Sequence, residues 1–329
     1  MSLRESPPVK SNDVAWHTNI SLAGRSTWRI GGPAHWIAQP QTPDALAHLL
    51  KEWPDETPRL MLGGGSNILF DDDGFHGIVI DLSRFFARST LLEEGASTLM
   101  DHPATPGQRA EGGSERDQVL RVDAGVNTRT MAHTARRLGL GGAEFLAGIP
   151  GTIGGALRMN AGAYGSEMRN IMIQALVMDD CGEAHILTPE TLGMDYRTTT
   201  LPAGWILLRA DFRLHPDDPA AIRSRMQAYN RKRAASQPLR YPSAGSTFKN
   251  PPSAPLAWRL IDDAGMRGYR VGDAQVSEKH SNFLINRGAA TSDEMRALIT
   301  RVRKRVAQRC GIELELEVAI FDTDGPRSG

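Results

Sequence analysis

The chain has 329 residues, which exceeds one ordinary domain and suits two or three. Its 38 basic and 38 acidic residues cancel, so no net charge favours binding to nucleic acid or a membrane surface. No apolar run approaches the roughly 20 residues of a membrane span, and a disulfide-built domain or a zinc site is disfavoured by 2 cysteines and 9 scattered histidines. We therefore expect a cytoplasmic globular protein that binds neither nucleic acid nor membrane and holds no metal.

After a flexible polar lead over residues 1–15, the first two-thirds of the chain alternate short strands with occasional helices. Helices are predicted where apolar residues recur at helical spacing, and strands where short apolar runs end at turn residues. A stretch rich in Gly, Pro and polar residues, 97–117, is expected to form an exposed insertion. The predicted helices are Pro43 to Trp53 and Thr128 to Leu138, and the strands are Arg59 to Leu62, Gly77 to Leu82, Val119 to Ala124 and several between Met172 and Leu214.

Composition shifts at Pro216. The segment Pro216 to Pro219 introduces a long basic helix, which is predicted from Ala220 to Ala235. A second helix is predicted from Ser292 to Arg309, with Thr291 and Glu294 as its capping box and Gly311 at its end. Residues Glu313 to Phe321 alternate charged and apolar side chains, which predicts a closing strand.

This pattern predicts an α+β fold. We expect a first domain over residues 16–215, divided into subdomains at about 16–88 and 89–215. A smaller mixed domain would cover 216–323 and a tail 324–329.

Two glycine-rich segments carry the strongest functional signal. The first, Leu62 to Leu69 (LGGGSNIL), follows a predicted strand and precedes another, so it is neither a Walker loop nor a dinucleotide fingerprint. The second, Gly148 to Gly165, contains six glycines in the run GIPGTIGGALRMNAGAYG. Glycine lets main-chain N–H groups approach an anion, so two such loops favour a large phosphate-bearing cofactor. The alternatives are a tight hairpin turn for the first loop and close backbone packing for the second.

Single polar residues in the second half are ambiguous when each is considered alone. Ser246 lies in the turn-rich run YPSAGSTFKNP together with Lys249 and Asn250, and Arg197 lies in MDYRTTTL. Glu317 alternates with apolar neighbours and faces either solvent or a cleft, and His280 is either a ligand contact or a structural histidine.

Considered together, these motifs resemble the UDP-N-acetylenolpyruvoylglucosamine reductase (UDP-N-acetylmuramate dehydrogenase) family over nearly the whole chain. The match rests on TWRIGGPA (Thr27 to Ala34), LGGGSN (Leu62 to Asn67), AGIPGTIGGALRMNAGAYG (Ala147 to Gly165), DYR (Asp195 to Arg197), PSAGSTFKNP (Pro242 to Pro251), HSNFLIN (His280 to Asn286) and LELEV (Leu314 to Val318). The chain resembles the shorter branch of this family, which lacks the insertion carrying a substrate-capping tyrosine. It departs from the family at Ala319 and Asp322, where Arg and Gly are common.

The resemblance implies a flavin-binding fold of the vanillyl-alcohol-oxidase type, with two α+β subdomains holding FAD and a third domain covering the substrate. It also implies NADPH as reductant, UDP-N-acetylglucosamine enolpyruvate as substrate, and a role in peptidoglycan precursor synthesis; we expect a monomer. No Cys or His lies in LGGGSNIL, so non-covalent FAD is expected. The cofactor-binding residues expected from the two loops are Gly63, Gly64, Gly65, Ser66, Asn67, Gly148, Ile149, Pro150, Gly151, Thr152, Gly154, Gly155, Asn160, Gly162, Ala163 and Tyr164.

The resemblance also implies catalytic roles for Ser246, Arg197 and Glu317. Arg197 would stabilise the enolate formed after hydride transfer, Glu317 would lie beside the same carboxylate in protonated form, and Ser246 would protonate the neighbouring carbon. Lys249, Asn250 and His280 are expected to contact the substrate. Two other interpretations remain: a sugar or alcohol oxidase on the same fold, and a nucleotide-binding regulatory module without catalysis.

Overall fold

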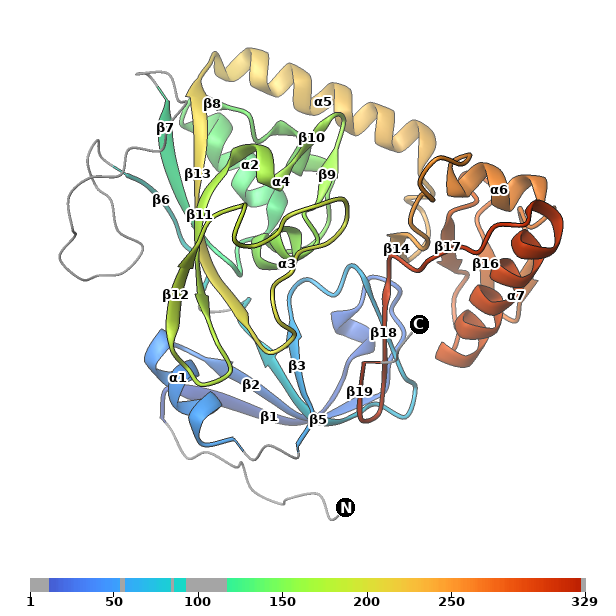
Figure 1. Ribbon diagram of the computed structural model, residues 1–329, viewed down its shortest axis with the longest axis horizontal. Coiled ribbons are helices and arrows are strands. Elements are labelled where there is room, and N and C mark those ends of the chain that lie inside the picture. Colours follow the sequence, from blue (N-terminus) through green and yellow to red (C-terminus); the bar gives the residue numbers. More distant parts are fainter. Residues whose placement is uncertain (1–11, 54–56, 84–85, 93–116, 327–329) are drawn as a thin grey trace.

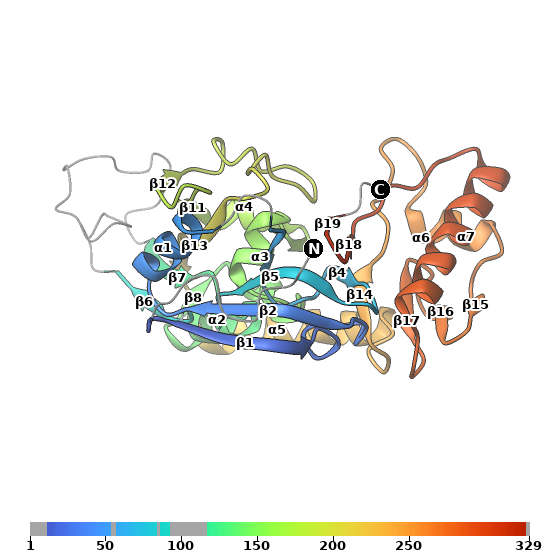
Figure 2. The same cartoon turned by 90° about the horizontal axis from the view of Figure 1, so that it is seen from below.

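The computed structural model describes residues 12–53, 57–83, 86–92 and 117–326 (Figure 1). Most of the predicted insertion at 97–117 and the first 11 residues of the predicted lead lie outside these ranges. The described residues form three mixed units, each with its own sheet. Seen from below, the third sheet and its helices lie to one side of the other two (Figure 2).

The first unit is a four-stranded sheet in the order β1-β2-β5-β3, in which only β1 is antiparallel to its neighbour. Helix α1 buries Leu46 and Leu49 against it and begins where Thr42 accepts a hydrogen bond from the Ala45 N–H. Strand β1 starts at Val14, inside the predicted lead. The bounds are β1 Val14–Ser21, β2 Pro33–Pro40, α1 Pro43–Lys51, β3 Arg59–Leu62 and β5 Phe75–Asp81, with the 3₁₀ helix η1 at Ala23–Arg25.

The second unit is an antiparallel sheet in the order β12-β11-β13-β7-β6, with β8 paired to the end of β13. Its core lies between this sheet and the helices α2, α3 and α4, and Phe212 and Met131 are fully buried there. The bounds are β6 Ser89–Leu91, β7 Gln118–Asp123, α2 Thr128–Arg137, β8 Leu140–Gly141, η2 Glu144–Gly148, α3 Ile153–Arg158, β9 Gly162–Ala163, β10 Ser166–Glu167, α4 Met168–Ile171, β11 Met172–Met178, β12 Ala184–Leu187 and β13 Ile206–Pro216.

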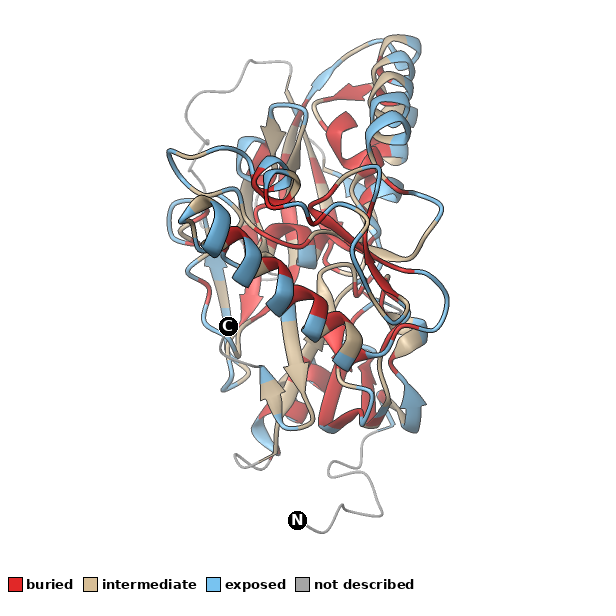
Figure 3. Ribbon diagram, turned by 90° about the vertical axis from the view of Figure 1, so that its right-hand side faces the viewer, coloured by how far each residue is buried: buried red, intermediate tan, exposed pale blue. Residues whose placement is uncertain are grey.

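Helix α5 runs from the second unit to the third (Figure 1). The third unit packs α6 and α7 on the sheet β14-β17-β16-β15. As predicted, Thr291 and Glu294 form a capping box at the start of α7, and Gly311 ends it in the left-handed conformation at φ 67°. One face of α7 is buried and the other exposed (Figure 3). The bounds are α5 Pro219–Ser236, β14 Ser243–Ser246, α6 Ala257–Asp263, β15 Arg270–Val271, β16 Ala274–Val276, β17 Phe283–Asn286 and α7 Ser292–Cys310.

Two segments connect the third unit to the first. Trp28 is fully buried in the core of the third unit, and its indole N–H donates to the Leu284 carbonyl at 2.7 Å. After α7 the chain returns, and β18 (Ala319–Asp322) pairs with β4 (Ile68–Phe70) and β19 (Gly325–Pro326).

The predicted closing strand from Glu313 to Phe321 is therefore wrong in its first part, because only its last residues form β18. The Glu317 N–H instead donates to the Thr247 carbonyl at 2.9 Å, so this segment crosses between units rather than lying in one sheet. Among the helices of the described part of the chain, none is long and apolar enough to cross a membrane.

Candidate functional site

A cavity of 640 Å³ lies where the three units meet, within the size range of ligand and cofactor sites. Both glycine loops line it, and so do Arg197, Ser246 and Glu317. The predicted loops and the predicted catalytic residues, which are far apart in sequence, therefore share one cavity.

The first glycine loop connects β3 to β4 and packs directly on the second loop. A Cβ atom placed on Gly64 would lie 2.5 Å from Gly151 Cα, a separation that real side chains do not adopt. Gly65 has φ 58°, and a Cβ atom there would lie 1.7 Å from the Arg25 carbonyl oxygen. The hydroxyl of Ser66 donates to the Pro150 carbonyl at 3.2 Å. Glycine is thus required by close backbone approach as well as by backbone conformation.

Two threonines hold the first part of the second glycine loop. The Thr128 N–H donates to the Gly151 carbonyl at 3.1 Å, and the Thr128 hydroxyl donates to the Ile149 carbonyl at 2.5 Å. Thr152 caps α3 by accepting from the Gly155 N–H. These contacts fix the first part of the loop next to the cavity.

Of the sixteen residues predicted to bind the cofactor, only Asn160 does not line the cavity. Its side chain is fully buried, donates to the Asp195 carbonyl at 3.1 Å and accepts from the Arg169 N–H at 3.0 Å. The structure therefore places Asn160 behind the cavity wall, where it fixes the segment that carries Arg197.

Arg197 joins the second unit to the carboxyl-terminal segment. Its Nε lies 3.0 Å from Glu317 Oε1, and its Nη2 donates to the Gly162 carbonyl at 3.0 Å. Arg197 itself has φ 55°, a conformation uncommon outside glycine. The Glu317 carbonyl accepts from Asn67 Nδ2 at 2.9 Å, so Glu317 is bound to the first glycine loop as well.

Ser246 is the last residue of β14 and lies opposite Phe283 of β17. The next residue, Thr247, accepts the Glu317 N–H through its carbonyl. Ser246 is thus next in the chain to the residue that binds Glu317, Glu317 binds Arg197, and all three line the cavity, as do Ser246's neighbours in β14.

The environment of Glu317 shifts the pKa of its carboxyl group. Burial raises the pKa of its carboxyl group, while the charges of Arg197 and Lys249 act in the opposite direction. The net direction is upward.

The three residues predicted to contact the substrate lie outside the cavity lining. The Lys249 ammonium lies 2.5 Å from Glu315 Oε1, and Asn250 Nδ2 donates to the Tyr196 hydroxyl at 3.1 Å. The His280 ring packs between Trp258 and Phe283, and burial lowers its pKa. Asn250 therefore bridges the third unit to the loop of Arg197, whereas His280 packs inside the third unit.

Arg233 lines the cavity. In the sequence, the basic run Arg231 to Arg233 is typical of a solvated helix face, and its alternative interpretation is attraction of a diphosphate. The structure turns Arg233 toward the cavity, and burial, followed by the nearby charge of Arg129, lowers the pKa of its guanidinium. Beside it the Tyr164 ring stacks on Tyr229, with centroids 4.3 Å apart and an interplanar angle of 5°. Helical spacing from the buried Met226 would have placed Tyr229 and Arg233 on the inward face.

The lining fits FAD held without a covalent bond. A Cβ atom on Gly63, Gly64 or Gly151 would lie within 3 Å of a neighbouring atom, so the loops leave bare backbone beside the cavity. No histidine or cysteine of the described residues lines the cavity, so none could tether a flavin there.

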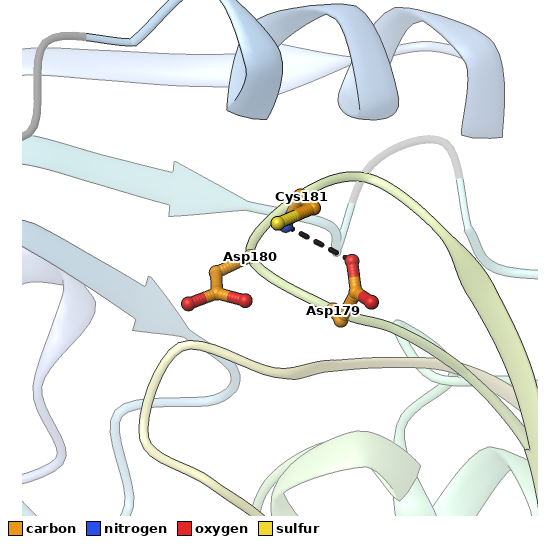
Figure 4. Close-up of side chains that lie close together, drawn as sticks. All are labelled: Asp179, Asp180 and Cys181. Atoms are coloured by element: carbon orange, nitrogen blue, oxygen red, sulfur yellow. Dashed lines mark hydrogen bonds between the residues drawn. The ribbon is translucent and has the colours of Figure 1, made fainter.

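One cluster of possible metal ligands occurs among the described residues, at Asp179, Asp180 and Cys181 in the turn between β11 and β12 (Figure 4). Asp179 Oδ1 already accepts the N–H groups of Cys181 and Glu183, at 2.9 and 2.8 Å. Its other carboxylate oxygen lies 2.7 Å from His185 Nε2. Asp179 therefore serves the turn itself, and we assign no metal to it.

Comparisons with known proteins agree with this geometry. The family described as UDP-N-acetylenolpyruvoylglucosamine reductase, C-terminal domain, matches residues 237–321, and an FAD binding domain family matches residues 34–188. The chain is 48% identical over 321 residues to the UDP-N-acetylenolpyruvoylglucosamine reductase of Magnetococcus marinus, covering 98% of this chain and 97% of the relative. It is 42% identical to that of Gluconobacter oxydans, with 94% of each covered. The crystal structure of the reductase from Thermus caldophilus aligns with a TM-score of 0.72 at 33% identity, over 93% of this chain and 98% of that one.

Proposed function

The chain belongs to the UDP-N-acetylenolpyruvoylglucosamine reductase family, and we propose that it reduces UDP-N-acetylglucosamine enolpyruvate to UDP-N-acetylmuramate with NADPH as reductant. It is an FAD-dependent oxidoreductase of peptidoglycan precursor synthesis, on the predicted α+β fold. The observation that carries the proposal is that Ser246, Arg197 and Glu317 line the same cavity as the two glycine loops, with Arg197 and Glu317 in direct contact.

The chain would hold FAD through the two glycine loops. FAD supplies hydride transfer when bound, and the protein supplies position and electrostatic field. Gly63 to Asn67 and Gly148 to Thr152 leave room for the diphosphate, and the carboxyl-terminal segment closes the site from the third unit.

Arg197 would bind the substrate carboxylate and stabilise the negative charge that spreads onto it in the transition state. Its guanidinium is half-buried and already held on two sides, by Glu317 and by the Gly162 carbonyl. A cation fixed before the reaction needs no reorganisation when charge develops, which is the main source of such stabilisation.

Ser246 would donate a proton to the carbon next to the carboxylate. Serine is a weak acid, so this role depends on position rather than on acidity. The raised pKa of Glu317 supports a protonated carboxyl group that donates a hydrogen bond to the same substrate carboxylate, instead of repelling it.

Arg233 supports recognition of a diphosphate, because it is a cation at the cavity wall with no carboxylate partner among the ion pairs of the described residues. We assign it to the diphosphate of the sugar nucleotide or of the reductant. We further propose that the enzyme acts as a monomer in the cytoplasm, where both nucleotides are available, and that it thereby serves cell-wall growth, cell shape and division.

The direct experiment supplies purified protein with NADPH and the enolpyruvyl sugar nucleotide, and follows NADPH absorbance and product mass. Oxidation of NADPH that depends on the sugar nucleotide, with a product heavier by two hydrogen atoms, supports the proposal. NADPH oxidation that depends only on oxygen would instead indicate an oxidase on the same fold.

A further inference from the structure

A second cavity, of 380 Å³, lies in the seam between α2 and α5, outside the site described above. Six side chains from these two helices line it, and none of them is acidic. They are His133, Arg136, Arg223, Met226, Gln227 and Asn230.

The polar residues of this seam follow helical periodicity on both sides. On α2, Arg129, His133 and Arg136 are spaced i, i+4 and i+7, and on α5, Arg223 and Asn230 have the same i, i+7 relation. Residues at these spacings share one face of a helix. Each helix therefore presents a stripe of cationic or hydrogen-bonding side chains toward the seam.

Among the described residues, no carboxylate forms an ion pair with an arginine that lines the seam. Arg225, two residues after Arg223, forms ion pairs with Glu144 at 2.5 Å and with Asp217, so the charge of that arginine is compensated. No ion pair of the described residues includes Arg136 or Arg223, and the Nε of Arg136 is buried without a hydrogen-bond partner. A buried unpaired donor costs free energy, and two cations around one cavity repel each other unless an anion lies between them.

The seam lies next to the main cavity. Gly148 lines the main cavity, and a Cβ atom placed on it would lie 3.8 Å from Asn230 Oδ1 and 3.4 Å from Arg233 Cδ. The charge of Arg129 acts on Arg233, so the first cation of α2 lies near the main-cavity residue Arg233. The first residues of α2 also contact the second glycine loop, since Asn127 is bridged to Thr152.

We propose that the α2–α5 seam binds the 2′-phosphate of NADPH and thereby selects NADPH over NADH. This inference rests on the proposed function, which supplies NADPH as reductant. The two reductants differ only in that phosphate group, and arginine is the side chain best suited to bind phosphate through paired hydrogen bonds. A reductant that enters the main cavity past Arg233 would leave its second anionic group near Arg136 and Arg223.

The test is anaerobic stopped-flow reduction of the enzyme-bound flavin by NADPH and by NADH in Arg136→Gln, Arg223→Gln and the double variant. In each single variant, the NADPH concentration that gives half the maximal rate of flavin reduction should rise roughly tenfold, which is the effect of losing one charged hydrogen bond. Reduction by NADH should stay within about twofold of the wild type, so the double variant loses most of its preference. Arg301→Gln, an exposed arginine on α7, removes the same charge and should change neither reaction.

Three outcomes separate the explanations. An unchanged ratio of NADPH to NADH efficiency in the double variant would overturn the inference. A rise in the KM of the enolpyruvyl sugar nucleotide with that ratio unchanged would also overturn it and assign the seam to the sugar nucleotide. If neither reductant bleaches the wild-type flavin, the proposed function fails. In that case binding of adenosine 2′,5′-bisphosphate tests the seam by itself: if it binds no tighter than AMP, the seam does not bind a 2′-phosphate.

Discussion

Replacing Gly64 with alanine tests the close approach of the two glycine loops beside the cavity. The added Cβ atom would lie 2.5 Å from Gly151 Cα, 3.1 Å from Gly151 C and 3.3 Å from Thr152 N. Ordinary contacts between carbon atoms are about 3.5–4.0 Å, so the two glycine loops must separate by about 1 Å. Overpacking of this kind typically costs about 1–3 kcal/mol.

That cost can appear in two measurable quantities. If the loops separate before FAD binds, the apoprotein keeps its stability and the Kd for FAD rises about 5- to 150-fold, the equivalent of about 1–3 kcal/mol. If the loops stay together, the strain lowers the free energy of unfolding of the apoprotein instead. Fluorescence titration of the apoprotein with FAD and urea unfolding of the same sample together recover the full cost.

Gly24→Ala is the matched control, because nothing lies within 4 Å of a Cβ atom at that position and its φ is not positive. It should leave FAD affinity unchanged and raise stability by a few tenths of a kcal/mol at most, through the unfolded chain. Gly64→Ala with wild-type FAD affinity and wild-type stability, alongside an unchanged control, would refute the reasoning about close loop approach.

Three further predictions concern the polar residues. Ser246→Ala should leave flavin reduction by NADPH nearly intact and slow flavin reoxidation by the enolpyruvyl substrate about 10²–10⁴-fold in stopped-flow traces. The control Ser236→Ala, at an exposed serine, should change neither rate. If Ser246→Ala changes neither half-reaction, Ser246 is not the proton donor. Arg197→Lys keeps the charge but loses the planar fork, so reoxidation by substrate should slow at least roughly tenfold at equal flavin content, and wild-type reoxidation would contradict the role of the fork. His280→Asn should flatten the pH dependence of stability: the folded-state pKa of His280 lies below its usual 6.5, so the unfolded chain binds more protons and wild-type stability falls as pH drops below 6.5. The prediction is contradicted if urea unfolding shows the same decrease in the free energy of unfolding for wild type and variant as the pH falls below 6.5.

The regular elements were predictable where local chemistry decides the structure. The start of α7 follows from Thr291 and Glu294, and its end from Gly311, because capping involves only neighbouring residues. The segment before β18 was not predictable in this way. The alternation from Glu313 to Phe321 is typical of a strand, but the main chain of Glu317 pairs with Thr247 and Asn67, and those contacts depend on how the units meet.

The candidate site shows the same division between local and long-range information. Glycine spacing identified the loops, because bare backbone is needed wherever a cofactor approaches closely. Asn160 belongs to the same motif yet lies behind the cavity wall, since its buried amide satisfies main-chain groups near Asp195. For the basic run Arg231 to Arg233, the sequence left open a solvated helix face and attraction of a diphosphate, and only helical spacing from Met226 distinguishes Arg233 as the inward-facing arginine.

For the proposed function to hold, one cavity must join a flavin, a nicotinamide reductant and an enolpyruvyl sugar nucleotide. The most direct measurement is the absorbance spectrum of the purified protein under anaerobic conditions, first alone, then with NADPH, and then with the enolpyruvyl substrate. We expect flavin bands that bleach with NADPH and return when the substrate is added. A protein that shows no flavin bands and cannot be reconstituted with FAD, or a reduced flavin that the substrate leaves bleached, would contradict this function.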